Sequence, residues 1–238
     1  MRKEKMKKLL ISGLLSLLLT GFANADTDNT SNTSLKDLPF DEVMKMATEK
    51  NDAKAQYNLG VRYDRGEGVE KDYAKAREWY EKSAAQGYAS AQSNLGTYYD
   101  YGTGVEQDYV KAKEWYEKAV AQNDDYAQYN LGILYIEGRG VEKDVSKARE
   151  LFEKAAKQGL ANAQYNLAIM YLEGEGVKKD IVTAKEWLEK AAIQGIPQAQ
   201  FNLGIMYENG QAVKKDHKKA MEWIEKACKN GIQHQICN

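Results

Sequence analysis

Histidine and cysteine side chains are the residues of this 238-residue chain best suited to bind a metal or catalyse a reaction. All four lie near the C-terminus, as His217, Cys228, His234 and Cys237. If one helix begins at His217 and ends at Cys228, about 1.5 Å per residue separates the two by roughly 16 Å, too far for one zinc ion. In an oxidising compartment, cysteines at this spacing favour a disulfide. The sequence therefore predicts a Cys228–Cys237 disulfide that clamps the tail onto the last helix, and no metal site or cofactor.

The serines, histidines and glycines do not form the motifs of known hydrolytic enzymes. Serine enzymes that recognise penicillins need Ser-x-x-Lys with a later Lys-Thr-Gly, and neither is present. Gly-x-Ser-x-Gly and His-Glu-x-x-His are absent too. Four Gly-x-Gly turns superficially resemble a phosphate-binding loop, but no Lys-Ser or Lys-Thr follows them and each follows a helical pattern. The chain therefore offers no recognisable nucleophile, and we assign no catalytic residue.

A hexapeptide organises the chain and must position any functional residue. Ala127–Gly132 reads Ala-Gln-Tyr-Asn-Leu-Gly, and close copies begin at Ala55, Ala91, Ala163 and Ala199, each 36 residues from its neighbour. Every copy continues with a tyrosine, a Gly-x-Gly-Val turn or a variant of it, an aspartate and a second helical run. A fixed period without insertions is typical of a stacked repeat array.

Within each period the apolar residues recur at helical spacing, twice. In the first copy, Ala55, Leu59 and Tyr63 lie on one face of a first helix. Asp72 can cap a second helix, which ends at Gly87. Neither helix can bury its apolar face alone, so consecutive pairs must stack. We expect an all-α fold: an α-solenoid, coiled as a right-handed superhelix, of five 36-residue helix-turn-helix repeats with an N-terminal capping helix.

The N-terminal 25 residues have the pattern of an export signal. A basic leader precedes the apolar run Leu9–Leu19, and Ala23-Asn24-Ala25 is a small-x-small cleavage signal. We expect cleavage near Ala25 and a periplasmic or secreted mature protein that does not span the membrane. The expected organisation is a signal peptide at 1–25, a disordered lead-in at 26–38, the capping helix at 39–51, repeats at 52–87, 88–123, 124–159, 160–195 and 196–231, and a tail at 232–238.

Charge argues against a nucleic-acid partner. Removal of the leader, with five basic residues and one acid, changes the net charge from −1 to −5, whereas nucleic-acid binding needs a basic stripe. On the second helix, Glu78 and Lys82 are four residues apart, and the pair recurs in every copy. We expect each pair to add about 0.3–0.5 kcal/mol to its helix on a solvated face.

The repeated residues resemble a known family. Ala-Gln-x-Asn-Leu-Gly, the following tyrosine, Gly-x-Gly-Val-x-x-Asp, Lys-Ala-x-x-Trp-x-x-Lys-Ala-Ala and the closing glycine are similar to the Sel-one-like repeat, a branch of the tetratricopeptide-like superfamily, over about Ala53–Gly231. The resemblance implies an α-solenoid that acts as an adaptor or binding scaffold. A secreted, cysteine-rich branch is associated with penicillin-type compounds, but its members carry a cysteine pair in most repeats, unlike this chain.

The same resemblance indicates a binding surface. In tetratricopeptide-like arrays the first helix of each repeat lines a concave groove, and the asparagine before Leu-Gly commonly faces it. This implies an amide ladder suited to the backbone of an extended peptide, made of Asn58, Asn94, Asn130, Asn166 and Asn202. Alternatively, the asparagines bridge successive first helices and set only the repeat geometry. Both interpretations remain open.

Residues that differ between repeats can carry specificity, because packing explains those that recur. At the groove-facing turn, the series Tyr57, Val61 and Arg65 changes from copy to copy. We predict a groove that is basic and polar at its N-terminal end, with an exposed apolar strip in the later repeats. This strip comprises Tyr129, Ile133, Tyr165, Ile169, Phe201 and Ile205.

The favoured function is an exported interaction scaffold whose groove binds a protein or peptide. The alternative is an envelope enzyme or binder that acts on β-lactam or peptidoglycan amides, which rests on the family association alone. Turnover of a chromogenic β-lactam above that of an unrelated protein would favour the enzyme.

Overall fold

The computed structural model describes residues 35–234, 236 and 237. Within these residues the fold consists of eleven α-helices without a strand, which confirms the predicted α-solenoid. None of these helices is both long enough and apolar enough to cross a membrane. The predicted signal peptide, its cleavage point and most of the polar lead-in lie outside the described residues.

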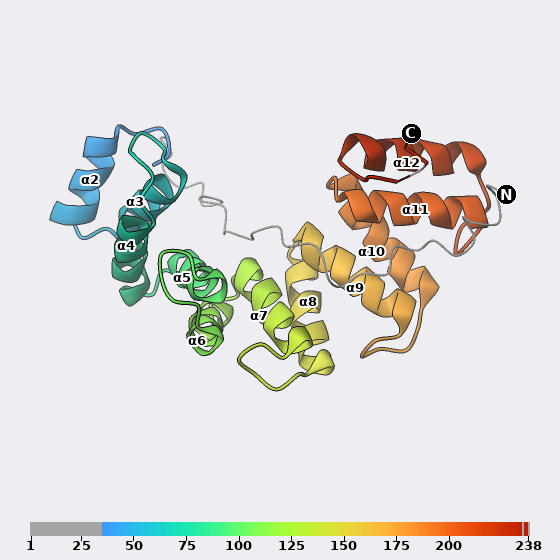
Figure 1. Cartoon of the computed structure of the whole chain (residues 1–238), viewed down its shortest axis with the longest axis horizontal. Helices are drawn as coiled ribbons and strands as arrows, with labels where there is room; N and C mark the ends of the chain where they lie inside the picture. The colour runs from blue at the N-terminus through green and yellow to red at the C-terminus, as the bar shows by residue number, and fades with distance from the viewer. Residues whose placement is uncertain (1–34, 235, 238) are drawn as a thin grey trace. The chain divides into compact units, whose positions relative to one another are not determined.

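A capping helix and five helix pairs make up the described chain (Figure 1). The capping helix is α2, Phe40–Glu49. The first helices of the repeats, called A helices below, are α3 (Ala53–Arg65), α5 (Ala89–Tyr101), α7 (Asp125–Glu137), α9 (Ala161–Glu173) and α11 (Pro197–Asn209). The second helices, called B helices, are α4 (Tyr73–Ala85), α6 (Tyr109–Val120), α8 (Val145–Lys157), α10 (Ile181–Ile193) and α12 (His217–Lys229).

The helices begin and end at residues that the repeat supplies in each copy. The Asp72 side chain accepts a hydrogen bond from the backbone N–H of Lys75 at the start of α4, and it satisfies a donor that the helix cannot pair. Equivalent aspartates cap α6, α10 and α12. Each A helix ends at a glycine with a positive φ, such as Gly66. A residue just after each B helix also has a positive φ. It is a glycine such as Gly87 in four repeats and Asn123, with φ of 66°, after α6, as the residue type predicted.

The described helices divide into two compact units, with the division between Asp144 and Val145 in the sequence. In the described part of the first unit, α2 to α7 each pack on the next helix in sequence, and α5 also contacts α7. In the second unit, α8 to α12 pack in the same consecutive manner. Each unit is therefore a stack in which one helix pair covers the next.

Small residues allow the A and B helices of a pair to approach closely. A Cβ atom at Gly60 would lie 2.5 Å from the ring of Tyr80, which is fully buried. Gly96 and Tyr116 repeat this arrangement. In the fourth repeat the pair becomes Ala168 with Leu188, so a larger A-helix residue accompanies a smaller B-helix residue.

The glutamine of the hexapeptide ties each A helix to the element before it. Gln56 Nε2 donates to the carbonyl of Ala47 at 3.0 Å, and its Oε1 accepts from Gln86 Nε2 at 2.8 Å. The Gln92–Gln122, Gln164–Gln194 and Gln200–Asn230 pairs repeat the second bond. These buried amides satisfy a helix-end carbonyl and so fix the spacing of the repeats.

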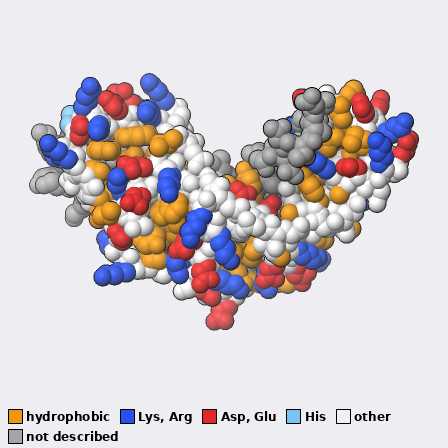
Figure 2. All heavy atoms as spheres, turned by 180° about the vertical axis from the view of Figure 1, so that it is seen from behind, with side chains coloured by type: hydrophobic (Ala, Val, Ile, Leu, Met, Phe, Trp, Pro, Cys, Tyr) orange, Lys and Arg blue, Asp and Glu red, His pale blue; other side chains and the backbone are white. Residues whose placement is uncertain are grey.

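The lysines of the solvated B-helix face do not pair as expected. Lys82 Nζ lies 4.0 Å from the centroid of the Trp79 ring, a cation–π contact that recurs in three further repeats. The observed ion pairs at this spacing involve the adjacent residues, as in Arg77–Glu81. The expected Glu78–Lys82 pairs are therefore wrong. In the four repeats with a tryptophan, the half-buried indole attracts the lysine, whereas the third repeat has Leu151 at that position. Figure 2 shows basic and acidic side chains interspersed with apolar ones on one face.

Arg62 closes the N-terminal end of the stack. Its guanidinium donates to the carbonyls of Leu35, Lys36 and Leu38 at 2.7–3.3 Å, and its Nε donates to Asn58. α2 covers α3 through Val43 and Ala47, as expected for a capping helix. The segment before α2 is thus held by a charged donor where later copies carry tyrosine, leucine or methionine.

Candidate functional site

The asparagines of the predicted ladder are buried, each exposed by 5% or less. Asn58 accepts a hydrogen bond from Arg62 on the same helix. Asn94 lies beside the hydroxyls of Tyr57 and Tyr80 in the preceding repeat. Burial raises the pKa of both tyrosines, and the amide of Asn94 acts in the opposite direction on each. Asn202 acts in the same way on Tyr165, whose pKa burial raises to about 12. These contacts between successive A helices favour the interpretation that the asparagines set repeat geometry.

Most of the predicted apolar strip is buried as well. Tyr165 and Ile169 belong to a core cluster with Leu188 and Leu203, and each is 1% exposed. Phe201 and Ile205 are fully buried. Tyr129 is also buried, whereas Ile133 keeps intermediate exposure. The expected exposure is therefore wrong for all but Ile133. Binding of a partner by this groove remains a prediction.

The physical reason for this burial is visible in the first repeat. The Tyr57 ring lies 5.7 Å from Tyr80 on its own B helix and 5.1 Å from Tyr88 of the next repeat, centroid to centroid. This position therefore contacts two neighbouring elements at once. Helical periodicity identified the face but not how deeply the neighbours cover it.

An equivalent position near the end of each A helix remains accessible and differs in nearly every repeat, because only the third and fourth copies share a residue type. We call it the variable row, and Arg65, Glu137 and Glu173 are its exposed members. Tyr101 and Asn209 are half-buried members. The chemistry changes from cation to phenol, carboxylate and amide along the repeats, so this row can discriminate between ligands where the buried columns cannot.

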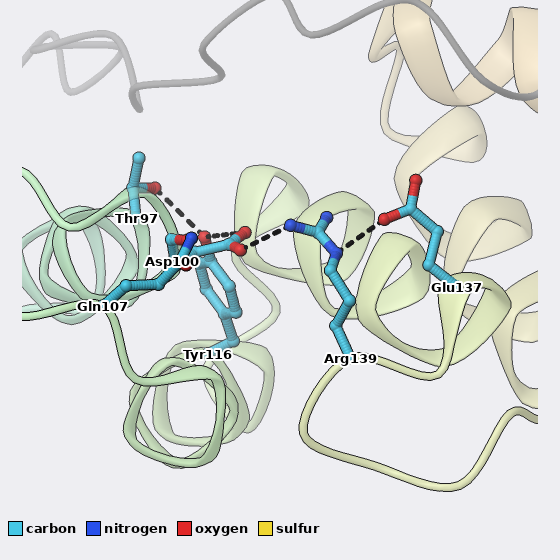
Figure 3. A network of polar contacts seen from close by, with 6 residues as sticks. All are labelled: Thr97, Asp100, Gln107, Tyr116, Glu137 and Arg139. Atoms are coloured by element: carbon cyan, nitrogen blue, oxygen red, sulfur yellow. Dashed lines mark hydrogen bonds and ion pairs between the residues drawn. The ribbon is translucent and has the colours of Figure 1, made fainter.

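A polar network around Asp100 lies beside the variable row (Figure 3). Arg139 Nη1 donates to Asp100 Oδ1 at 2.8 Å, and its Nε pairs with Glu137. The Tyr116 hydroxyl lies 3.4 Å from Asp100 Oδ2 and 3.3 Å from Thr97 Oγ1. Because Asp100 lies in the last turn of α5 and Arg139 follows α7, the network joins the second repeat to the third.

Burial is the largest influence on this carboxyl and raises the pKa of Asp100 to about 6. Arg139 and Tyr116 act in the opposite direction, and Glu137 adds to the increase. Asp64 occupies the equivalent place one repeat earlier, where it accepts a 2.6 Å hydrogen bond from Tyr98. Both carboxyls are hydrogen-bonded to side chains of neighbouring repeats, so the network stabilises the stack.

Sequence reasoning missed this network, although a signal was available. The column that contains Asp64 and Asp100 becomes Ile136 and Leu172 in the next two repeats and Glu208 in the fifth, so acids occur at a helix position that is apolar in the other two copies. Arg139 stands in a turn position occupied by acidic or uncharged residues in the other copies.

The C-terminal cysteines form the predicted disulfide, with their Cα atoms 5.5 Å apart. His217 Nδ1 lies 2.7 Å from Glu208, while the His234 ring lies 5.1 Å from that of Phe201. The histidines thus have separate surroundings. Across the residues that the structure describes, no group of three or more His, Cys, Asp and Glu side chains is arranged to hold a metal ion.

Comparison with known families and structures agrees with this fold. The model of the Sel1 repeat matches residues 53–88, 89–124, 125–160, 161–196 and 197–232. A search of curated proteins finds no match.

Among solved structures, c5321, a protective antigen of uropathogenic Escherichia coli with an SLR fold, is 39% identical with a TM-score of 0.74. That alignment covers 82% of this chain but only 41% of the antigen. A Sel1 repeat protein from Oxalobacter formigenes is 35% identical with a TM-score of 0.73, covering 81% of this chain and 77% of that one. The immunity protein PA5088 from Pseudomonas aeruginosa, 23% identical with a TM-score of 0.52 over 82% and 75% of the two chains, shares the fold.

Proposed function

Because the chain belongs to the Sel1 repeat family, whose members generally act as protein-interaction scaffolds, we propose that it is an exported scaffold that binds a protein segment along its A helices. The disulfide supports export, since such bonds persist in oxidising compartments. The E. coli relative is a protective antigen, and this is a second observation in favour of export. Neither the geometry nor the comparisons support the alternative of a β-lactam hydrolase.

The observation that carries the proposal is the contrast between buried and accessible positions on the same helices. The asparagine column is identical in five repeats and buried, so packing accounts for it. The variable row has a different residue in nearly every repeat and stays accessible at Arg65, Glu137 and Glu173. Packing does not require this variation, whereas recognition of an irregular protein segment does.

Burial also changes the choice of test. An aspartate at Ile169 would place a charge in the core, so loss of binding there would report unfolding. Exposed charges of the variable row avoid this problem. The double variant Arg65→Glu, Glu173→Lys reverses two of them and leaves the net charge unchanged.

A control with the same charge changes is available on the B helices. Lys157 and Glu186 are both exposed, on α8 and α10. The double variant Lys157→Glu, Glu186→Lys therefore matches the row variant in number, sign and exposure of the altered charges.

The experiment is affinity capture from an envelope extract with the mature chain, residues 26–238, as bait. We expect a partner that the wild-type chain and the Lys157/Glu186 variant retain and the Arg65/Glu173 variant loses, with equal helical content by circular dichroism. Retention of the same partner by both variants would exclude the variable row as the binding surface.

A further inference from the structure

A cavity of about 580 Å³ lies beside the turn between α9 and α10, within the unit that contains residues 145–234 (Figure 1). Its lining consists of Arg149 on α8, Tyr171 on α9 and residues 176–180 of the turn. All of these residues are at least partly exposed. Cavities that bind ligands commonly have volumes of about 300–1,000 Å³. This cavity is therefore both large enough for a ligand and accessible to one.

A glycine of the turn brings the lining residues together. Gly176 has a φ of 68°, and a Cβ atom there would lie 2.7 Å from Cγ1 of Val145, the first residue of α8. Arg149 comes four residues after Val145 and therefore lies on the same face of that helix. The close contact at Gly176 thus places the turn and the Arg149 guanidinium on the same side of α8.

The lining has an excess of positive charge. Arg149, Lys178 and Lys179 are three cations and Asp180 is one acid, which gives a net charge of +2. The Asp180 carboxylate accepts hydrogen bonds from two backbone N–H groups of α10 and from the Thr183 hydroxyl. The acid of the cavity is therefore used to cap a helix rather than to pair with the cations.

Neighbouring side chains neutralise the three cations only in part. Arg149 Nη1 pairs with Glu153, and the buried Nε makes no hydrogen bond among the described residues. Within the same part of the chain, neither Lys178 nor Lys179 forms an ion pair. Guanidinium and ammonium groups are donors without acceptor capacity. An anionic ligand would supply the acceptors that these donors lack.

This positive charge is particular to the later repeats. Lys178 stands where the first three repeats have glutamate, as in Glu142, and the fifth repeat has Lys214. The valine before this position and the aspartate two residues after it are the same in all five copies, so packing of the turn does not require the charge reversal. Residues 35–144 contain 15 basic and 21 acidic side chains, a net charge of −6, whereas residues 145–238 contain 14 and 11, a net charge of +3.

A second difference between repeats leaves space beside Tyr171. In the first, second and fifth repeats a B-helix lysine lies over the equivalent tyrosine, as Lys75 Nζ lies 5.4 Å from the centroid of the Tyr63 ring. The fourth repeat has Thr183 at the position of this lysine. Because threonine is shorter and uncharged, a ligand can occupy the place that the lysine takes in the other copies.

We infer that this cavity, called the basic pocket, binds an acidic segment of the partner protein, whose carboxylates pair with Arg149, Lys178 and Lys179. Hydrogen bonds between such cations and carboxylate oxygens are charge-assisted and therefore strong. Lys214 repeats the positive charge in the next turn along the chain. Cations in two consecutive repeats suit a segment with several acids better than a single small anion. The inference rests on the proposed scaffold function and names the chemistry of the partner.

Deca-glutamate is the probe, with uncharged deca-glutamine as the negative probe. Calorimetry gives the affinity for residues 26–238 at about 0.1 M salt, where a Debye length of about 10 Å screens distant charges. Lys178→Glu introduces the residue that the first three repeats carry, so the turn should keep its fold. The matched control is Lys157→Glu, the same charge reversal at an exposed position of α8, about 12 Å beyond Arg149 along the helix.

Arg149→Met tests the guanidinium. The fifth repeat has Met221 at this position, so methionine is compatible with the packing of a B helix. The matched control is Arg77→Met, because Arg77 occupies the equivalent position of α4 and pairs with Glu81 in the same way.

We expect deca-glutamate to bind the wild type and both controls with affinities within about twofold. Lys178→Glu should bind it about tenfold more weakly, and Arg149→Met about three- to tenfold more weakly. Failure of the wild type to bind, equal binding of deca-glutamine, or equal losses in a variant and its control would overturn the basic pocket. Displacement of deca-glutamate by an equal concentration of inorganic phosphate would overturn the assignment to an acidic segment.

The two proposals can fail separately. If deca-glutamate does not bind while the Arg65/Glu173 variant still loses its captured partner, only the basic pocket is refuted. If deca-glutamate binds as expected and that capture is unaffected, the variable row is refuted instead.

Discussion

Replacement of Gly60 by alanine tests whether the glycine is needed for close packing of α3 on α4, because helix propensity and packing predict opposite changes in stability. Gly60 lies inside α3, where alanine is favoured over glycine by about 1 kcal/mol in helix propensity. Propensity alone therefore predicts a more stable protein. The structure predicts the opposite, because the new Cβ would lie 2.5 Å from two ring carbons of Tyr80.

The size of the effect follows from how tightly that ring is held. Tyr80 is 1% exposed, and its centroid lies 5.7 Å from Tyr57 and 5.6 Å from Tyr98. Overpacking of such a site costs about 1–3 kcal/mol, and the constrained ring favours the upper end of that range. After the gain in propensity, Gly60→Ala should destabilise the chain by about 2 kcal/mol.

A double-mutant cycle isolates the contact. The fourth repeat combines Ala168 with Leu188, so Gly60→Ala should be tolerated once Tyr80 is leucine. Urea unfolding of the wild type, both single variants and the double variant gives the coupling energy, which we expect to reach about 2–3 kcal/mol. A stabilising Gly60→Ala change, or additive effects in the cycle, would refute the argument that the glycine column exists to admit the tyrosine ring.

Three further predictions concern the polar network and the two ends of the stack. Burial raises the folded-state pKa of Asp100 from 3.8 to about 6, so the stability that this carboxyl contributes is complete below pH 3.8 and is lost as the pH rises through 6. Relative to Asp100→Asn, the wild type should therefore lose up to about 3 kcal/mol of unfolding free energy between pH 4 and pH 7, measured by urea titration. The same pH dependence in both proteins would contradict this prediction. The Cys228–Cys237 disulfide closes a short loop and should stabilise the fold by about 2–3 kcal/mol. Reduction of the disulfide should therefore lower the midpoint of thermal unfolding as much as replacement of both cysteines by serine does. An unchanged midpoint would show that the tail is held without the disulfide. Arg62→Met should destabilise the chain by about 2 kcal/mol, because the hydrogen bonds from Arg62 to the segment before α2 are lost. Amide hydrogen exchange should become faster in α2 than in α12. An equal increase in both helices would contradict the role of Arg62 at the N-terminal end of the stack.

The fold was predictable because the constraints that set it are local and recur five times. Asp72 at a helix start and Gly87 at a helix end each have a backbone reason visible in the sequence. The 36-residue period then implies stacking, because neither helix can bury its apolar face alone. The Cys228–Cys237 bond was predictable for a similar reason, since the two residues are only nine apart.

The candidate site was less predictable because it depends on contacts between repeats. Periodicity places Tyr165 and Ile169 on one face of α9, but only the packed structure shows that neighbouring helices cover them. Lys82 could pair with Glu78 by spacing alone, yet it lies over Trp79. Each of these outcomes is a competition between two partners, and the sequence gives the partners without the distances that decide between them.

Site-specific photo-crosslinking tests the central claim most directly, namely that recognition occurs at the positions where repeats differ. A photoreactive phenylalanine would replace Tyr101 in the variable row or, as a control, the exposed Glu114 on α6. After irradiation in an envelope extract, we predict a covalent adduct with a partner protein from position 101 and none from position 114. An adduct from position 114 alone would contradict this claim, because the partner would then bind the solvent-exposed face of the B helices.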